Sequence, residues 1–279
     1  MNTKFVKGLL ACALVAAPLT GCSSGSGDDA AEDKTITIGA SVTPHAEIIN
    51  NIVPDLEELG YTVEVVEFSD YVKPNQALYE GELDCNYFQH TPYLEDWVAN
   101  NCENEDDLVS AAKIHFEPLG IYSSKHTDVS DVPDGAQIAV PNDTTNEARA
   151  LQLLQAQGII TLAEGKGLEA TKADIVENPH NVEIIELAAE VVPTKLNEVD
   201  FAIANGNNAL NADITDYLLV TESTDSEAAD QYANVIAVRK GDEDSQKIKD
   251  LLSVLETQKT VDFIEENYNG VVVPVFEVK

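Results

Sequence analysis

The sequence predicts an α/β fold of two lobes, in which parallel-rich sheets are flanked by helices and a ligand binds in the cleft between the lobes. The main observation is that β-branched, strand-like runs alternate with helix-like segments along most of the chain, as in parallel βα units. The alternation comes in two sets, joined by long extended segments at 111–124 and 232–239. Such sheets bind ligands at the carboxyl ends of their strands.

The N-terminus is predicted to be a targeting signal. Lys4 and Lys7 form a short basic region, and residues 8–17 are an apolar stretch of about ten residues, too short to span a bilayer as a helix. Leu19-Thr20-Gly21-Cys22 resembles the bacterial lipobox, in which the cysteine receives a diacylglyceryl group and becomes the new N-terminus. We therefore predict a lipoprotein signal peptide at 1–21 and a mature protein that Cys22 anchors to the extracytoplasmic face of the cell membrane. The alternative is an ordinary signal peptide with an incidental cysteine.

A flexible tether is expected at 22–33. The segment SSGSGDDAAED after Cys22 has no bulky apolar residue and cannot bury enough surface to become ordered. No later stretch approaches the length of a transmembrane helix, so we expect lipid alone to hold the mature protein. The folded part is divided into lobe 1 at 34–117, lobe 2 at 118–235 and a return to lobe 1 at 236–279.

The chain is strongly acidic. Its formal net charge is −34, and removal of the signal peptide, which contains Lys4 and Lys7 but no acid, makes the mature value −36. A surface this anionic repels nucleic acid, so nucleic-acid binding is excluded. The few cationic groups become informative, because the chain has only two arginines, Arg149 and Arg239.

Two cysteines, Cys85 and Cys102, remain in the folded part. An even pair in an exported protein is a candidate disulfide. The alternative is two unpaired thiols, one of them buried in a strand. The sequence leaves both open, because it does not give the Cα separation that a disulfide needs.

The first lobe is predicted to begin with a strand at 35–40. A helix follows at 44–59, with Gly60 as its stop, and Pro54 is expected to kink or divide it. Strands at 61–68 and 83–88 then alternate with helices at 74–80 and 92–100. The extended stretch 111–124, interrupted by Pro118, is expected to leave this lobe and enter the next.

The second lobe resumes the alternation. A strand at 137–140 precedes Asn142-Asp143-Thr144-Thr145, which provides N-cap side chains for a helix that runs to Gln157 and stops at Gly158. Strands are predicted at 182–187 and 200–204, with a helical segment between them. The strand at 232–239 crosses back, and helices near 244–256 and 261–268 finish the chain.

Four rings are predicted to gather at strand ends in the first lobe. Tyr71 follows the second strand, and Phe88, His90 and Tyr93 lie at and after the end of the third. Aromatic rings form an apolar wall suited to a small apolar side chain, and a thioether gains from contact with their edges. One such ring alone would more often belong to the core, whereas four together favour a binding site.

Polar groups follow strands elsewhere in the chain. Arg149 lies in the early turns of its helix, where a planar guanidinium and a helix N-terminus both favour a carboxylate. A surface ion pair is the alternative, but the flanking helix surface carries Gln and Ala rather than charge. Asn205 and Asn234 are turn residues when taken singly, yet an amide binds an ammonium through its oxygen or a carboxylate through its nitrogen. The set predicts a site for a zwitterionic amino acid with an apolar side chain.

These residues lie in motifs that resemble a known family. From about Lys34 to Phe276 the chain is similar to the methionine-binding lipoproteins, the solute receptors of the methionine ABC importer. The motifs are VEFSDYVKPNQAL, GELDCNYFQHTPYL, HFEPLGIYS, IAVPNDTTNEARALQLL, DIVENP, IANGNNAL and YANVIAVR. PNDTTNEAR and NYFQHTPYL are the specific ones, whereas GNNALNADIT departs somewhat from the family pattern.

The resemblance implies a periplasmic-binding-protein fold that closes on one amino acid, methionine, and delivers it to the permease and ATPase subunits of an ABC importer. It implies no cofactor and no metal. L-methionine, D-methionine and a methionyl dipeptide stay open as ligands. The residues that it assigns are Tyr71, Phe88, His90 and Tyr93 around the ligand side chain, Arg149 at its carboxylate, and Asn205 and Asn234 at its amino and carboxylate groups.

Two other function classes are alternatives. A secreted hydrolase would need a nucleophile elbow or a metal-hydrolase motif, and none of the Ser, His and acidic residues lies in one. A metal-ion receptor would use imidazoles, which suit zinc or manganese, but the sequence has no H-x-H or H-x3-H pair and no His-rich loop. We therefore expect a binding protein and not an enzyme. The histidines available to a metal receptor are His45, His90, His115, His126 and His180.

Overall fold

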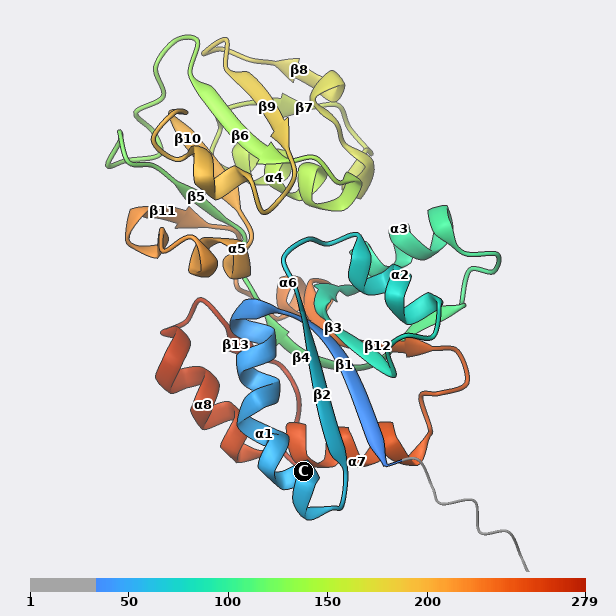
Figure 1. Ribbon diagram of the computed structural model, residues 1–279. Helices are drawn as coiled ribbons and strands as arrows, with labels where there is room; N and C mark the ends of the chain where they lie inside the picture. Colours follow the sequence, from blue (N-terminus) through green and yellow to red (C-terminus); the bar gives the residue numbers. More distant parts are fainter. Residues whose placement is uncertain (1–33) are drawn as a thin grey trace, which may run out of the picture. The chain divides into compact units, whose positions relative to one another are not determined.

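Two mixed β-sheets, one in each lobe, organise the computed structural model (Figure 1). The structure describes residues 34–279, apart from the side chains of residues 226 and 227. The predicted signal peptide, Cys22 and the tether at 22–33 lie outside the described residues. Within the described range, no helix has the length and apolar character needed to cross a membrane.

The first sheet has the strand order β13-β4-β12-β3-β1-β2. β1 pairs in parallel with β2 and β3, as the βα pattern predicts, whereas β12 adds antiparallel pairs with β3 and β4. The elements of this lobe are β1 (Thr35–Ser41), the π-helical turn η1 (Val42–Ala46), α1 (Glu47–Glu58), β2 (Thr62–Phe68), α2 (Lys73–Tyr79), β3 (Cys85–His90), α3 (Thr91–Asn101), β4 (Leu108–Phe116), β12 (Ala233–Arg239), α7 (Gln246–Leu255), α8 (Gln258–Tyr268) and β13 (Val273–Pro274).

Helices cover both faces of this sheet. Side chains alternate along β12, as in any strand, so that Ile236 and Val238 pack in one apolar cluster with α1, α7 and α8. Val235 and Ala237 pack on the other face with α2 and α3. The strand ends at the edge facing the second lobe therefore remain available to a site.

The second sheet has the order β11-β5-β10-β6-β9, with β6 parallel to β9 and β10 and with β5 antiparallel to its neighbours. β7 and β8 form a separate two-stranded antiparallel sheet within the same lobe. The elements are β5 (Gly120–Tyr122), β6 (Gln137–Pro141), α4 (Thr144–Ala156), β7 (Thr161–Leu162), η2 (Gly167–Glu169), η3 (Lys172–Asp174), β8 (Ile175–Glu177), β9 (Glu183–Leu187), η4 (Val192–Lys195), β10 (Phe201–Ala204), α5 (Gly206–Asn211), η5 (Thr215–Tyr217) and β11 (Leu218–Thr221).

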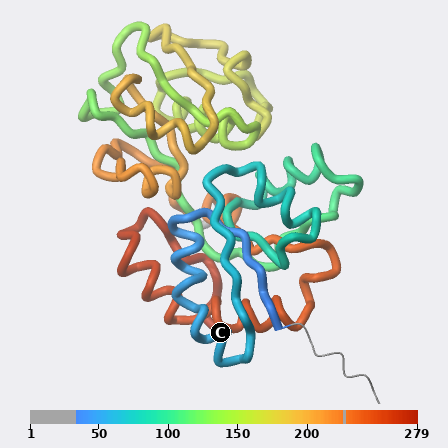
Figure 2. The backbone as a smooth tube through the Cα atoms, in the orientation of Figure 1, coloured from blue at the N-terminus to red at the C-terminus, as the bar shows by residue number. Residues whose placement is uncertain are grey.

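The chain passes between the two sheets twice (Figure 2). It leaves the first sheet at the end of β4 and enters the second at β5, within the extended stretch that the sequence predicts for this purpose. It returns between β11 and β12, through the short helix α6 (Ser226–Gln231). The returning strand begins at Ala233, before the boundary that the sequence analysis places at residue 236.

Local sequence signals explain both ends of α4. Asp143 caps α4, accepting a hydrogen bond from the Asn146 amide at 3.0 Å, and Gly158 follows the helix at a φ of 73°. Of the two outcomes expected at Pro54, a kink or a division of the first helix, the division does not occur, because α1 continues through the proline. The helix buries Ile48, Ile49, Ile52 and Leu56. Burial of four aliphatic side chains, about 1.5–3 kcal/mol each, outweighs the roughly 3 kcal/mol cost of an internal proline.

Candidate functional site

A pocket lies between the two lobes, at the carboxyl ends of β3 and β10 and at the amino end of β12, where Asn234 is the second residue and so does not follow a strand as predicted. All seven residues that the sequence analysis assigns to a ligand line it, and four others that it does not name line it as well. The lining residues are Tyr71, Phe88, Gln89, His90, Tyr93, Glu117, Asn146, Arg149, Asn205, Asn207 and Asn234.

Three aromatic rings form one wall of the cavity, as predicted from their positions near strand ends. Tyr71 lies between β2 and α2, Phe88 in β3 and Tyr93 in the first turn of α3. The ring centroids of each pair are 5.9 Å apart, and the tilted and T-shaped arrangements are those that aromatic pairs prefer. Phe88 and Tyr93 are buried. This aromatic wall is preorganised by its own ring contacts.

His90 completes the wall and connects it to the second lobe. It is the last residue of β3, which extends two residues beyond the end of the predicted strand at 83–88, and its side chain also caps α3 by accepting from the Tyr93 amide at 3.1 Å. Its Nε2 lies 3.1 Å from Asn146 Oδ1. Burial, and then the charge of Arg149, lower the pKa of His90 to about 3, so the imidazole is neutral and Nε2–H donates to the asparagine oxygen.

Arg149 is buried and ion-paired, which its local sequence did not indicate. Its Nε donates to the two carboxylate oxygens of Glu222 at 2.8 and 3.0 Å, and its Nη2 donates to the same carboxylate. Nη2 also donates to the Glu117 carbonyl at 2.8 Å, and the guanidinium lies over the Tyr232 ring at 4.3 Å. Within the described part of the chain, Nη1 makes no hydrogen bond, so it is the nitrogen left for a ligand.

A chain of amides fixes the orientation of Asn205. Asn146 Nδ2 donates to the Asp143 carboxylate at 2.8 Å, and since a carboxylate only accepts, Asn146 Oδ1 must be an acceptor. Asn205 Nδ2 donates to that oxygen at 2.8 Å. Asn205 is 7% exposed, and its Oδ1 has no hydrogen-bond partner among the described residues. The cavity therefore contains one buried acceptor that lacks a donor.

The two lobes are joined across the cavity by the Tyr71 hydroxyl. It donates to Asn207 Oδ1 at 2.6 Å and accepts from Asn208 Nδ2 at 2.9 Å, and both asparagines belong to α5 of the second lobe. Tyr93 in turn donates to the Tyr71 carbonyl at 2.9 Å. These bonds, together with the one between His90 and Asn146, describe a closed cleft.

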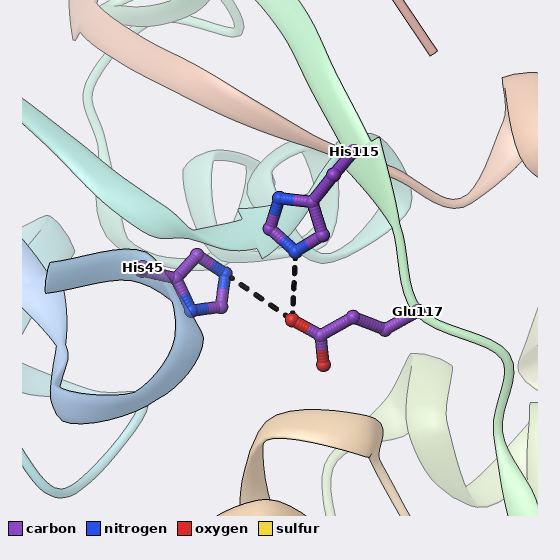
Figure 3. Close-up of side chains that lie close together, drawn as sticks. All are labelled: His45, His115 and Glu117. Carbon is purple, nitrogen blue, oxygen red and sulfur yellow. Dashed lines mark hydrogen bonds and ion pairs between the residues drawn. The ribbon is translucent and has the colours of Figure 1, made fainter. Parts of the chain in front are cut away.

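A buried cluster of His45, His115 and Glu117 lies behind the cavity, with the three side chains pointing toward one another (Figure 3). His115 Nε2 is 2.7 Å and His45 Nε2 3.6 Å from Glu117 Oε1. Burial lowers the pKa of His45 to about 4 and of His115 to about 3, so both are neutral. Three potential metal ligands thus converge here, although the sequence shows no metal-ligand spacing, because β4 and η1 come together only in the fold.

The residues that the sequence analysis missed are Gln89, Glu117, Asn146 and Asn207. Gln89 lies between two residues that it named, and Asn207 lies two residues after Asn205. Asn146 could have been predicted from the N-cap motif. Its amide donates to the capping residue Asp143, so it lies in the first turn of α4, at the end of the helix that lines the cavity. Glu117 is the acidic residue next to Pro118 in the predicted crossing. Its position directly after a strand, like the other assigned residues of this lobe, could have predicted that it lines the site.

The candidate disulfide is not formed, because Cys85 and Cys102 are free thiols. Cys85 lies in β3 and points into the cluster shared with α1, α7 and α8. Cys102 follows α3 and packs against the cluster on the opposite face of the sheet. Side chains on opposite faces of one sheet cannot approach to disulfide distance.

Comparisons with known proteins agree on one family. The family model for NlpA lipoprotein matches residues 36–276. The chain is 41% identical over 262 residues to the methionine-binding lipoprotein MetQ of Bacillus subtilis, covering 93% of this chain and 94% of that protein. A nutrient-binding protein from Burkholderia cenocepacia, solved bound to methionine, is 40% identical with a TM-score of 0.81, over 86% of this chain and all 100% of that one.

A periplasmic substrate-binding protein of an ABC transporter from Coxiella burnetii is 34% identical with a TM-score of 0.79, over 86% of this chain and 100% of that one. These structures confirm the two-lobed α/β fold that the sequence predicts. The family match covers nearly all of the described residues, and it confirms the resemblance found in the sequence motifs. The chain belongs to the NlpA lipoprotein family.

Proposed function

We propose that this protein captures methionine outside the cytoplasm and delivers it to the permease and ATPase subunits of an ABC importer. The observation that supports this most directly is the cavity itself, with an aromatic wall on the first lobe and a buried arginine and amides on the second. A neutral zwitterion with an apolar side chain matches both sides. The names of the Bacillus subtilis and Burkholderia cenocepacia relatives point to the same ligand.

The aromatic wall is assigned to the ligand side chain. Tyr71, Phe88, His90 and Tyr93 offer ring edges and faces, and a thioether sulfur gains about 0.3–1.5 kcal/mol from each good contact with an aromatic edge. Because the rings already contact one another, little ordering is needed when the ligand enters.

The ligand carboxylate is assigned to Arg149 and Asn234. Glu222 occupies the Nε and Nη2 side of the guanidinium, so the carboxylate would meet Nη1 instead of the two parallel donors that the sequence analysis expects. His45 Nε2 and Asn234 Oδ1 are 2.9 Å apart. With its oxygen engaged there, Asn234 presents its amide nitrogen as the donor to the ligand.

Anchoring and closure complete the proposal. Residues 1–21 would be cleaved as a signal peptide, Cys22 would carry the lipid, and 22–33 would tether the folded part. The lobes at 34–117 with 236–279, and at 118–235, would close on the ligand, since its contacts lie on both and its affinity for the closed form drives closure. No catalytic step is assigned.

Calorimetric titration of the full chain, after exhaustive dialysis from denaturant and refolding, tests the ligand. One molecule of methionine should bind to each chain. Glutamate should not bind, because its side-chain carboxylate would lie against the aromatic wall. Absence of methionine binding to folded protein would refute the proposal.

A second experiment tests the lipid anchor. Cys22→Ser should yield uncleaved or unanchored protein with unchanged methionine affinity. Wild-type protein that stays in the aqueous phase of a detergent extraction would contradict the lipid anchor.

A further inference from the structure

Glu222 is a mostly buried carboxylate in the second crossing between the lobes. It directly follows β11, and its side chain is 13% exposed. Its backbone amide donates to the Leu119 carbonyl at 2.9 Å, and its Oε1 accepts from the Leu119 amide at 2.9 Å. Leu119 belongs to the first crossing, between β4 and β5. Glu222 therefore ties together the two segments that connect the lobes.

The same carboxylate holds the guanidinium of Arg149 along one edge. Arg149 Nε donates to Glu222 Oε1 at 3.0 Å and to Oε2 at 2.8 Å, and Nη2 donates to Oε1. Nη2 also donates at 2.8 Å to the carbonyl of Glu117, a residue of the first crossing. The orientation of the guanidinium is thus fixed by the crossings and not by its own helix, α4.

Arg149 borders a second pocket as well as the cavity. This outer pocket is lined by Arg149, Glu222 and Tyr232, together with polar side chains of α4, of α6 and of the segment before α6. Arg149 lines both spaces, whereas Glu222 lines only the outer pocket. The guanidinium therefore stands at the boundary between the two. The polar side chains of the outer pocket are Gln152, Ser223, Asp225 and Gln231.

The outer pocket offers Arg149 an alternative position. Asp225 supplies a carboxylate there, and the amide oxygens of Gln152 and Gln231 are further acceptors for a guanidinium. A charged side chain is more favourable where acceptors and water surround it than in a buried site without its partner. Without Glu222, we expect Arg149 to turn towards the outer pocket and to withdraw Nη1 from the cavity.

We propose that Glu222 is the positioning residue of the carboxylate anchor, and that through Arg149 it sets the affinity for ligands with a free carboxylate. This inference rests on the proposed function, in which Nη1 of Arg149 binds the ligand carboxylate. Glu222 acts only through the arginine, since it does not line the cavity. It determines which edge of the guanidinium the ligand meets.

The charge of Glu222 acts in the opposite direction. A carboxylate beside Arg149 partly cancels the guanidinium charge and so weakens its attraction for a second carboxylate. If screening were the only role of Glu222, its removal would strengthen methionine binding. We expect positioning to outweigh screening, because an arginine that relaxes towards Asp225 is neutralised again and lies farther from the ligand.

Calorimetric titration of the full-length protein in detergent tests the inference with methionine and with methionine amide, which lacks the carboxylate. The measured quantity is the ratio of the two affinities, because a general loss of structure weakens both ligands alike. In Glu222→Ala this ratio should fall by roughly 10- to 30-fold, since binding must then restrict a freely rotating arginine side chain. Glu222→Gln keeps one acceptor oxygen and should lower the ratio by an intermediate amount.

Glu256→Ala is the matched control. Glu256 directly follows α7, its side chain is 11% exposed, and it forms an ion pair with Lys279. It lines neither the cavity nor the outer pocket. Its removal breaks an ion pair of similar burial, so the affinity ratio should stay within about threefold of wild type.

NMR provides a second test on the wild-type protein. The chain has only two arginines, so a proton–nitrogen correlation spectrum contains two arginine Nε–H signals, and Arg239→Ala identifies the one from Arg149. This Nε–H should exchange slowly with water, with and without methionine, because it is buried and bonded to Glu222. The Nε–H of Arg239, whose side chain is 30% exposed, should exchange faster.

The outcomes separate this inference from the proposed function. If wild type binds methionine but Glu222→Ala keeps the affinity ratio within about threefold, or raises it, the inference is overturned and the proposed function stands. If Glu222→Ala does not fold, an Arg149 Nε–H that exchanges as fast as that of Arg239 in the wild type overturns it instead. If wild type binds no methionine, both fail.

Discussion

Arg149→Ala is expected to weaken methionine binding and, by a separate route, to destabilise the fold. Arg149 is 3% exposed, lines the cavity and is held by the Glu222 carboxylate. Removing one partner of a desolvated charge pair typically costs about 2–5 kcal/mol. Because Glu222 already cancels part of the guanidinium charge, we expect the lower part of that range, about 2–3 kcal/mol, or roughly 30- to 150-fold in affinity.

The cost to stability has another origin. Without Arg149, the Glu222 carboxylate, whose side chain is 13% exposed, keeps a hydrogen bond from the Leu119 amide at 2.9 Å but loses its cation. An orphaned, mostly buried charge costs on the order of 3 kcal/mol. The double variant Arg149→Ala/Glu222→Gln should therefore recover stability but not affinity, which separates the two effects.

Isothermal titration with methionine and with methionine amide provides the assay, and urea denaturation follows stability. Methionine amide, which lacks the carboxylate, should bind wild type weakly and lose much less on Arg149→Ala. Arg149→Lys should recover only part of the affinity, because a lysine lacks the planar donor array. Arg239→Ala is the matched control, since Arg239 ends β12 away from the cavity and donates to the Leu78 carbonyl at 3.0 Å.

The reasoning is refuted if folded Arg149→Ala retains methionine affinity within about threefold of wild type, a difference below 1 kcal/mol. Loss of affinity that Glu222→Gln restores in the double variant would also contradict it, because the effect would then come from the unpaired carboxylate and not from the missing anchor.

Three further predictions follow from the same structure. Tyr71→Phe removes the hydroxyl that bonds two asparagines of α5, so methionine affinity should fall by about fivefold, the equivalent of one net hydrogen bond; an unchanged affinity would contradict this. We expect methionine to decrease the radius of gyration of wild type in small-angle scattering, and this decrease should need a higher methionine concentration in Tyr71→Phe. Thiol labelling of denatured, unreduced protein should modify both Cys85 and Cys102, and protection of both would restore the disulfide hypothesis. Stability should fall as the pH drops from about 6.5 towards 4, by up to roughly 1.4 kcal/mol per pH unit for each buried histidine. These histidines are His45, His90 and His115, whose pKa values in the folded state are about 4, 3 and 3. Because these values lie below the unfolded value of 6.5, the unfolded chain binds protons in this pH range and the folded chain does not, so stability falls as the pH falls. Urea denaturation at pH 7 and pH 5 measures the change, and equal stabilities at the two pH values would count against it.

Short-range patterns in the sequence were sufficient for the α/β class, for the capped helix α4 and for the position of the first crossing. Each depends on spacing within a few residues, such as the bond from Asp143 to the Asn146 amide. The gathering of Tyr71, Phe88 and Tyr93 was predictable for a related reason, because the ends of parallel strands meet at one edge of a sheet. The helix is not divided at Pro54, because tertiary burial outweighed a local preference.

Tertiary structure alone decided which atoms of the site are engaged and which are free. Glu222 pairs with Arg149 from far along the chain, and His45 approaches Glu117 from a different part of the first lobe. The two cysteines are close in sequence, yet the sheet separates them. The physical reason is that a sequence specifies the chemical groups and their local periodicity, whereas the hydrogen bonds and charges that each buried group still lacks depend on partners that only the folded chain brings within a few ångströms.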